Sequence, residues 1–397
     1  MVEFNPLSDD FFNDPYDTYR WLRDDEPCYF NERFGFYALS RFDDVVSAHR
    51  DWRTFSSEHG LTLDTLTNPD ANVKGQSIIM MDPPDHDRMR KLVSRAFTPR
   101  SITRMEPIAH EIMAKYLDLV SDAGEFDAVT DFAAPFPVEV ISAILGVPEA
   151  DRQQIRHWTD AMLLRRPNDP EPTQEGMEAG LFQVLYFLDL IKDKRRNPGD
   201  DMIGQLIEAE VVDDDGVTNR LTDEEVAGFA TLLAAAGSET VTKLVGSAIV
   251  LFHRNPGEWA KVLGDRSKVV GAVEETLRYW APSQYQGRFS HVDSEWHGVT
   301  IPAGKPVFLV TGAANRDERE YENPDAFDVD REIGLSIGLG HGIHSCLGAA
   351  LARLESRMAI EQWAERFPSY SVDEAGCRRV NMSNVAGYSN VPVTVGA

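Results

Sequence analysis

The chain has 397 residues, of which 42% are hydrophobic and 26% charged, and its 39 Lys and Arg against 65 Asp and Glu give a formal net charge of −26. This composition is typical of a folded globular protein, and the acidic balance excludes general nucleic-acid binding, which requires a basic surface. The longest apolar run, residues 229–237, is too short for a membrane span, which needs about 20 residues. Because the N-terminus also lacks a basic and apolar leader, we expect a cytoplasmic protein with no membrane span.

Apolar residues recur three and four positions apart along most of the chain, which predicts a mainly helical protein. The clearest predicted helices are residues 108–119, 181–192, 223–253 and 349–367. The predicted short strands are residues 36–39, 299–310 and 391–395. A polar, Pro-rich stretch at 165–180 predicts a surface loop. Since no Gly/Ser linker or repeat divides the chain, we expect one domain over residues 1–397, mainly α with small peripheral β-sheets.

The longest predicted helix begins at a capping box, in which Thr222 and Glu225 satisfy each other's backbone N–H groups. No helix-breaking residue follows until Asn255 and Pro256. The helix would therefore run for about 30 residues, or roughly 45 Å at ~1.5 Å per residue, which is the width of the whole domain.

The centre of this helix is irregular, because Gly237 follows three alanines and precedes Ser238, Glu239 and Thr240. A glycine inside a helix costs about 1 kcal/mol relative to alanine, so the position needs a reason. One reason is close packing of another helix against Gly237. The other is a bare, locally loosened helix face that a flat ligand and a small molecule can approach, with Glu239 and Thr240 placed for proton delivery.

The three cysteines, Cys28, Cys346 and Cys377, form no CxxC motif and are too few for a disulfide framework. Cys346 lies in the glycine-rich sequence LGHGIHSCLGAALAR at 339–353, just before a predicted helix, where the helix dipole favours a thiolate. His344 is poorly placed as the base for a cysteine nucleophile, and the loop offers too few ligands for zinc. An inert buried cysteine remains open, but the surrounding glycines favour a haem thiolate ligand.

The 339–353 segment resembles the haem-binding loop of the cytochrome P450 superfamily, of the bacterial type. Further segments match family motifs in the family's order. They are DPPDHDRMR at 82–90, AGSET at 236–240, ETLR at 275–278 and NRD at 315–317. The resemblance covers essentially the whole chain. It implies the P450 fold, with haem b (iron protoporphyrin IX) between a long central helix and the cysteine-bearing loop.

The resemblance also assigns roles to individual residues. Cys346 would be the axial thiolate ligand of the iron, with Gly348 beside it in the haem loop. The residues matching propionate-binding positions are His86, Arg90, Arg288 and His344. Ala236 and Gly237 match the groove where oxygen binds, and Glu239 and Thr240 match the acid and alcohol that deliver protons. Glu275 and Arg278 match a structural ion pair behind the haem loop.

The chain departs from the family pattern at three positions. Leu339 stands where the family usually has Phe, which removes an aromatic ring near the thiolate. Ala326 lacks the basic side chain that often completes the network of Glu275 and Arg278, and Arg331 is a candidate replacement. Glu239 replaces the commoner Asp and is one methylene longer, which changes the geometry of proton delivery.

A basic segment lies between residues 88 and 104 of this otherwise acidic chain and contains no acidic residue. Its members are Arg88, Arg90, Lys91, Arg95, Arg100 and Arg104. A solvated helix face would explain them. The resemblance instead implies a docking site for an acidic ferredoxin, itself reduced by a ferredoxin reductase, because the chain carries no electron-transfer domain of its own.

The resemblance places a substrate pocket on residues 61–79, 162–185, 232–236, 283–286 and 384–388. We expect a monomer that binds a hydrophobic molecule with one or two polar groups. The predicted substrate-contacting residues are Leu232, Ala235, Ala236, Ser283 and Gln284. Steroids, terpenoids, fatty acids and polyketides all fit this description.

The predicted activity is monooxygenation, the insertion of one atom of O2 into a C–H bond. The Glu239 and Thr240 pair favours it over a peroxygenase or a haem-thiolate isomerase, which would not need proton delivery. A non-catalytic haem or lipid binder and a cysteine hydrolase without haem are the alternatives from other classes.

Overall fold

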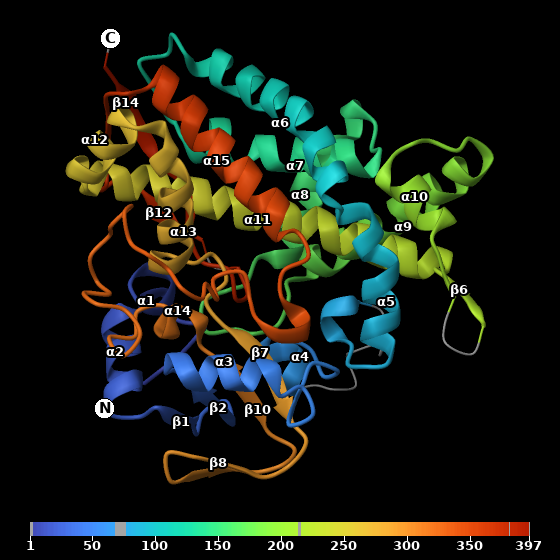
Figure 1. Cartoon of the computed structure of the whole chain (residues 1–397), viewed down its shortest axis with the longest axis vertical. Helices are drawn as coiled ribbons and strands as arrows, with labels where there is room; N and C mark the ends of the chain where they lie inside the picture. The colour runs from blue at the N-terminus through green and yellow to red at the C-terminus, as the bar shows by residue number, and fades with distance from the viewer. Residues whose placement is uncertain (1–2, 68–76, 213–215, 381, 397) are drawn as a thin grey trace.

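The computed structural model describes residues 3–67, 77–212, 216–380 and 382–396. Helices form most of this part of the chain, and Figure 1 shows them gathered above a smaller region that contains the main sheet. That sheet has five strands in the order β1-β2-β10-β7-β3. The predicted class, mainly α with small β-sheets at the periphery, is confirmed.

The helices have the following bounds. They are α1 Asp9–Asn13, α2 Tyr16–Asp24, α3 Phe42–Arg50, α4 Leu63–Thr67, α5 Asp85–Val93, α6 Pro99–Val120, α7 Pro135–Leu145, α8 Arg152–Leu163, α9 Gln174–Arg196, α10 Met202–Glu208, α11 Asp223–Arg254, α12 Pro256–Gly264, α13 Val269–Tyr279, α14 Thr311–Ala314 and α15 Ala349–Arg366. The four predicted helices lie within α6, α9, α11 and α15, apart from the last predicted residue of 349–367. The predicted loop at 165–180 is too long, because Thr173 caps α9 by accepting a hydrogen bond from the Gly176 N–H.

The strands are short, with two to five residues each. They are β1 Cys28–Asn31, β2 Phe36–Leu39, β3 Phe55–Ser56, β4 Glu125–Asp127, β5 Glu210–Val212, β6 Thr218–Arg220, β7 Gln286–Ser290, β8 Ser294–Trp296, β9 Val299–Ile301, β10 Pro306–Leu309, β11 Tyr370–Val372, β12 Arg378–Arg379, β13 Tyr388–Asn390 and β14 Pro392–Val395. Strand β10 runs parallel to β2 and antiparallel to β7. Arg288 of β7 pairs with Val307 of β10, so the sheet holds this predicted propionate ligand in place.

Helix α11 is the central element of the fold. It has 32 residues, begins at the predicted capping box of Thr222 and Glu225, and runs across the molecule in Figure 1 in contact with α7, α9, α13 and α15. By length and composition α11 could cross a membrane, since its best 18-residue window has a mean hydropathy of 1.2. However, 78% of that window is buried inside the protein, so α11 is a core helix.

The centre of α11 is a regular helix, and the predicted local loosening is wrong. The hydroxyls of Ser238 and Thr240 donate to the carbonyls of Ala234 and Ala236 at 2.6 and 2.8 Å, one turn earlier, while the backbone remains helical. Such back-bonding slightly destabilises a helix and often bends it, but α11 is continuous from Asp223 to Arg254. The packing explanation for Gly237 is confirmed, because a Cβ there would lie 3.0 Å from Cγ1 of Ile141 on α7.

A buried ion pair on α13 fixes the segment that precedes the cysteine loop. Glu275 and Arg278 meet at 2.7 Å with side chains only 1% exposed. Arg278 also donates to the carbonyls of Asn315, Pro324 and Ala326. Arg331, the candidate third partner, lies 3.3 Å from Glu275, so this prediction is confirmed.

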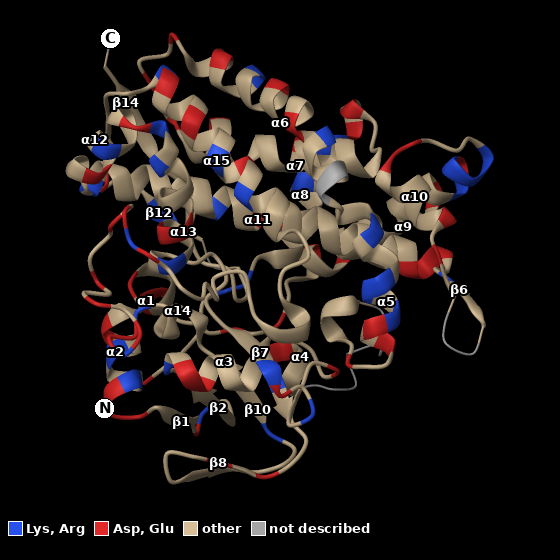
Figure 2. Cartoon of the chain, in the orientation of Figure 1, with Lys and Arg blue, Asp and Glu red and all other residues tan. Residues whose placement is uncertain are grey.

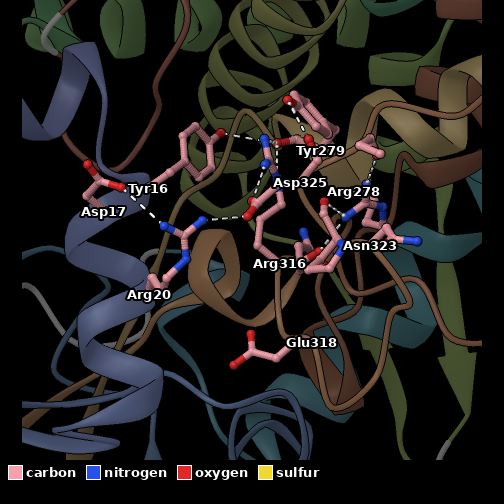
Figure 3. A network of polar contacts seen from close by, with 12 residues as sticks. Tyr16, Asp17, Arg20, Arg278, Tyr279, Arg316, Glu318, Asn323 and Asp325 are labelled. Atoms are coloured by element: carbon pink, nitrogen blue, oxygen red, sulfur yellow. Dashed lines mark hydrogen bonds and ion pairs between the residues drawn. The ribbon is translucent and has the colours of Figure 1, made fainter.

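Neighbouring contacts join the same segment to the N-terminal helices (Figure 3). Arg316 donates to Asp325 at 2.9 Å and to the carbonyl of Tyr279. Asp325 also accepts from Arg20 of α2 at 2.6 Å, and the Tyr16 hydroxyl donates to the same Tyr279 carbonyl. The chain between residues 315 and 331 is therefore held on two sides before it enters the cysteine loop.

We expect Glu275→Leu to lower the free energy of unfolding by about 3–5 kcal/mol, because it leaves the buried Arg278 guanidinium without its counter-ion. The neighbouring Glu274 is a matched control, since its ion pair with Arg353 is partly exposed and its loss should cost at most about 1 kcal/mol. Urea unfolding of both variants measures the difference, and equal losses would contradict the assigned role of Glu275.

Candidate active site

Two adjoining cavities, of about 220 and 170 Å³, lie between α11 and the loop that carries Cys346. Residues from both sides line the two cavities together. The shared lining residues are Ile79, Ala236, Thr240, Val241, Leu339, His344, Cys346 and Ala352. The structure therefore brings two predicted motifs that are about 100 residues apart in the sequence, AGSET and the cysteine loop, to opposite walls of one space.

The cysteine loop is shaped by its glycines and by backbone hydrogen bonds. Gly340 and Gly342 have φ values of 74° and 69°, which only glycine adopts without strain. The Cys346 N–H donates to the Leu339 carbonyl at 2.8 Å, and α15 begins three residues later. Cys346 is enclosed by the surrounding protein except toward the two cavities, and its accessible surface lines both of them.

The protein surroundings act on the Cys346 thiol in opposite directions. Burial raises its pKa, while the Gly348 N–H and the nearby Arg90 and Arg353 favour the thiolate. A metal ion bound at the sulfur would add the largest favourable contribution, because coordination deprotonates a thiol. The sulfur thus has the surroundings of a ligand that becomes a thiolate when a metal binds.

The four predicted propionate-binding residues converge on these cavities. Arg288 is 3% exposed, donates to the Gly287 carbonyl at 2.7 Å, and has no ion-pair partner among the described residues. Burial lowers the pKa of Arg288 to about 10. The rings of His86 and His344 pack 4.6 Å apart, and the Nε2 atom of each finds no hydrogen-bond partner in the described part of the chain. Arg90 lines the smaller cavity.

These donors fit the carboxylates of haem b. Buried donors and cations without acceptors are costly, and they are normally satisfied by an anion. Two propionates supply that negative charge, while Cys346 supplies the thiolate for the iron. Ala236 and Gly237 leave α11 without bulky side chains where it faces the cavity, which provides room for a flat group.

Of the predicted acid and alcohol, only Thr240 lines the cavities. Glu239 points elsewhere, because consecutive helical residues are turned by about 100°. Its carboxylate is 2.9 Å from the Lys243 ammonium, and both side chains are 4% exposed. Burial acts to raise the pKa of Glu239, but Lys243 and a hydrogen bond with Asp160 of α8 hold it below its ordinary value. Burial and the adjacent Glu239 raise the pKa of Asp160.

Two of the predicted substrate contacts are wrong. Gln284 is 2% exposed, and its side chain bonds to the Tyr19 hydroxyl at 2.8 Å and to the Ala281 carbonyl, away from the cavities. Ala235 lies on the buried side of α11 and lines neither cavity. Leu232, Ala236 and Ser283 do line them.

Several lining residues lie in segments that the resemblance assigned to the pocket, namely Leu61, Ser283, Gln286 and Asn384. Residues 162–185, which were assigned to the pocket as well, line neither cavity. Sequence reasoning missed His49 and Leu244. No motif marks His49, whereas Leu244 follows Thr240 by four positions and so lies on the same face of α11.

The basic segment at 88–104 is less uniform than predicted. Arg90 is directed into the cavity, Arg88 is paired with Glu225, and Arg104 lies 3.5 Å from Asp200. Lys91 and Arg95 are exposed and form no ion pair with the described residues. The side chain of Arg100 lies outside the described part. The unpaired basic surface is therefore centred on the end of α5.

The family model described as Cytochrome P450 matches residues 36–379 of the chain. The chain belongs to the cytochrome P450 family. It is 40% identical over 394 residues to the protein designated cytochrome P450 123 in Mycobacterium tuberculosis, covering 99% of this chain and 97% of the relative. It is also 33% identical over 399 residues to the biotin biosynthesis cytochrome P450 of Bacillus subtilis, with 99% of each covered.

Solved P450 structures confirm the fold. The ligand-free structure of cytochrome P450 TbtJ1 matches with a TM-score of 0.87 and 35% sequence identity. The match covers 99% of this chain and 100% of the TbtJ1 chain. CYP109E1 from Bacillus megaterium with testosterone has a TM-score of 0.88 and 30% identity, covering 97% of this chain and 98% of its own. The protein is accordingly a P450 monooxygenase, with haem b as its thiolate-ligated cofactor.

The pairing of Asp160 with Glu239 predicts a pH-dependent difference in stability. A carboxyl whose pKa is raised by folding holds its proton more tightly in the folded state, so its contribution to stability falls as pH rises from its ordinary pKa toward the raised value. Asp160→Asn has no titrating carboxyl at this position, so it does not lose this stability as the pH rises. We expect the variant to gain about 1 kcal/mol on the wild type between about pH 5 and pH 8, a modest gain because solvent reaches 37% of the Asp160 side chain.

Urea unfolding of both proteins across this pH range measures the gain. Asp169→Asn is the matched control, because Asp169 makes a half-exposed surface ion pair with Arg166 and accepts a hydrogen bond from the Glu171 N–H, which an Asn side chain can also accept. A difference in unfolding free energy between the wild type and Asp160→Asn that stays constant with pH would contradict the raised pKa of Asp160.

Proposed function

We propose that this P450 hydroxylates a hydrophobic small molecule with O2, using electrons that a ferredoxin reductase passes to a ferredoxin and the ferredoxin passes to the haem. The observation that carries the proposal is the position of Thr240 and Cys346 on opposite walls of one largely apolar cavity. An oxygen-binding position between a thiolate-ligated iron and a helix hydroxyl is what monooxygenation requires.

In this proposal Cys346 would supply the thiolate that holds the haem iron, with Gly348 and the loop backbone beside the sulfur. His86, Arg90, Arg288 and His344 bind the propionates through charge-assisted hydrogen bonds. Haem held in this way supplies the activation of dioxygen, and the thiolate increases electron density at the iron. Ala236 and Gly237 leave the space for O2 against α11.

Proton delivery falls to Thr240 and Glu239. Thr240 Oγ1 now donates to the Ala236 carbonyl at 2.8 Å, and its oxygen can accept a proton from solvent and pass one into the cavity. Glu239 does not line the cavity and Lys243 favours its carboxylate form, so Glu239 would relay a proton taken from Asp160 to Thr240 through water or a side-chain rotation. Asp160, which is partly exposed on α8, connects Glu239 with the outside.

The substrate is proposed to be mainly apolar, with one or two polar groups. Leu232, Ala236, Leu244 and other apolar side chains form most of the lining, and Ser283, Gln286 and Asn384 supply the polar positions. Solved relatives hold testosterone, corticosterone and a hexadecenoic acid ligated to an acyl carrier protein. Among the steroids, terpenoids, fatty acids and polyketides expected from the sequence, these ligands support a steroid or a fatty acid for this chain.

One observation favours a second candidate, a peroxygenase. Glu239 is held by Lys243 and directed away from the cavity, and an enzyme driven by peroxide would not need this acid.

Thr240→Ala separates the two candidates. If Thr240 delivers protons, we expect product formed per NAD(P)H consumed to fall roughly tenfold while peroxide production rises, because positioned proton transfer is lost. Thr242→Ala is the control, since Thr242 lies on the same helix, donates to the Ser238 carbonyl at 3.0 Å and lines neither cavity. Unchanged coupling in Thr240→Ala, with activity supported by hydrogen peroxide, would favour the peroxygenase.

The ferredoxin is proposed to dock at the end of α5, where Lys91 and Arg95 are exposed and unpaired within the described residues. Figure 2 shows the basic residues of α5 on a chain whose acidic residues are widespread. We expect Lys91→Glu with Arg95→Glu to weaken ferredoxin binding about tenfold and to reduce its salt dependence, with haem content unchanged.

Surface plasmon resonance with ferredoxin at several ionic strengths measures this effect. The control is Arg378→Glu, an exposed charge reversal on β12, across the view from α5 in Figure 1. Equal affinities of the double variant and the wild type would place the donor elsewhere.

We further propose that the chain acts in the cytoplasm as a monomer with one domain over residues 1–397. Contacts of α11 with helices from the middle and the end of the chain support the single domain.

A further inference from the structure

His49, in the last turn of α3, is a buried histidine that no family motif identified. It is 4% exposed, and neither Nδ1 nor Nε2 has a hydrogen-bond partner among the described residues. A neutral imidazole carries one N–H donor and one acceptor, so burying the ring with both unsatisfied opposes folding. Such a ring in a native structure requires an explanation.

The nearest amide, that of Gln286, acts on His49 in the direction of a hydrogen bond, but neither ring nitrogen meets the geometry of one. Gln286 lies close enough to influence the ring, but its amide nitrogen donates to Ser283 at 2.7 Å and its carbonyl accepts from Thr311 at 2.6 Å. The remaining side to which His49 is open is the larger cavity, which it lines together with Arg288, His344 and Cys346.

The charges around His49 point to a negatively charged group. Arg288 is buried beside it, and His86, His344 and Arg90 complete a set of donors. No carboxylate lines the larger cavity among the described residues, and Asp82, the acid that acts on Arg288, already accepts from the Ser57 N–H. Burial and Arg288 lower the pKa of His49 to about 3, so the ring is a neutral donor and not an additional cation.

Backbone packing fixes His49 on the haem loop. Its carbonyl lies where a Cβ of Gly342 would be, so only glycine fits at that position of the loop. The next residue, Arg50, donates from Nε to the Nε2 atom of His341 at 2.8 Å. The end of α3 is thus attached to the same loop that carries His344 and Cys346.

We propose that the His49 ring donates a hydrogen bond to a haem propionate, as an additional donor beside Arg288 and His344. The proposal rests on haem binding in this cavity, and it adds a residue from α3 to a set otherwise supplied by α5, β7 and the cysteine loop. His49 is a positioning residue: it holds the cofactor carboxylate and does not contact the reacting atoms. It also links α3 to the retention of haem.

The test compares His49→Phe, His49→Gln and the control His157→Phe, which changes an exposed histidine on α8. The rate of haem loss is measured by transfer to excess apomyoglobin, and the propionate bending band by resonance Raman spectroscopy. We expect His49→Phe to lose haem at least about tenfold faster and to shift the band, because a hydrogen bond to a charged group is lost. Gln keeps an N–H donor and should restore much of both properties, while His157→Phe should match the wild type.

Two results would overturn the proposal. One is a wild-type rate and band in His49→Phe. The other is equally fast haem loss from the Phe and Gln variants with an unshifted propionate band, which would show that His49 only fills space. Circular dichroism of the apoproteins identifies any variant that fails to fold, and the band of the reduced wild type with carbon monoxide reports separately on the thiolate.

Discussion

The approach of Cys346 to the small-residue face of α11 is the constraint on which the rest of the structure depends. A helix of 32 residues that crosses the molecule can present a bare face only where its side chains are small, and Ala236 and Gly237 provide that place. Opposite them, the loop glycines allow the backbone to turn so that the sulfur of Cys346 faces the cavity. The remaining elements fix these two walls relative to each other.

Charge completes the site. Arg288 is buried beside the cavity and forms no ion pair with the described residues, and His49, His86 and His344 have buried ring nitrogens without a hydrogen-bond partner among those residues. Burying such groups without an acceptor opposes folding, whereas burying them against two carboxylates favours it. Haem binding and the stability of this region are therefore coupled, and the ion pair of Glu275 and Arg278 holds the preceding segment in place for that binding.

Sequence reasoning succeeded where one local signal determines the structure. The capping box predicted the start of α11, and the loop motif predicted the position of Cys346 opposite Thr240. The absence of a basic residue at Ala326 pointed correctly to Arg331, because a buried carboxylate such as Glu275 needs a second cation nearby.

Sequence reasoning failed where the direction of a side chain depends on the rotation of its helix or strand, or on tertiary packing. Glu239 lies one position before the cavity-lining Thr240 on α11. The turn of about 100° between consecutive helical residues directs Glu239 to Lys243 and Asp160 instead of the cavity. Gln284 was favoured over Gln286 because the phase of β7 was unknown. His49 comes from a helix far away in sequence, and only the packing of α3 on the cysteine loop brings it to the site.

The central claim is that Cys346 is the thiolate ligand of haem. The most direct test is the carbon monoxide difference spectrum of the reduced protein, recorded for the wild type and for Cys346→Ser. The account predicts the strongly red-shifted Soret band of a thiolate-ligated carbonyl in the wild type and its loss in Cys346→Ser. Retention of that band in Cys346→Ser, or its absence from haem-loaded wild-type protein, would contradict the account.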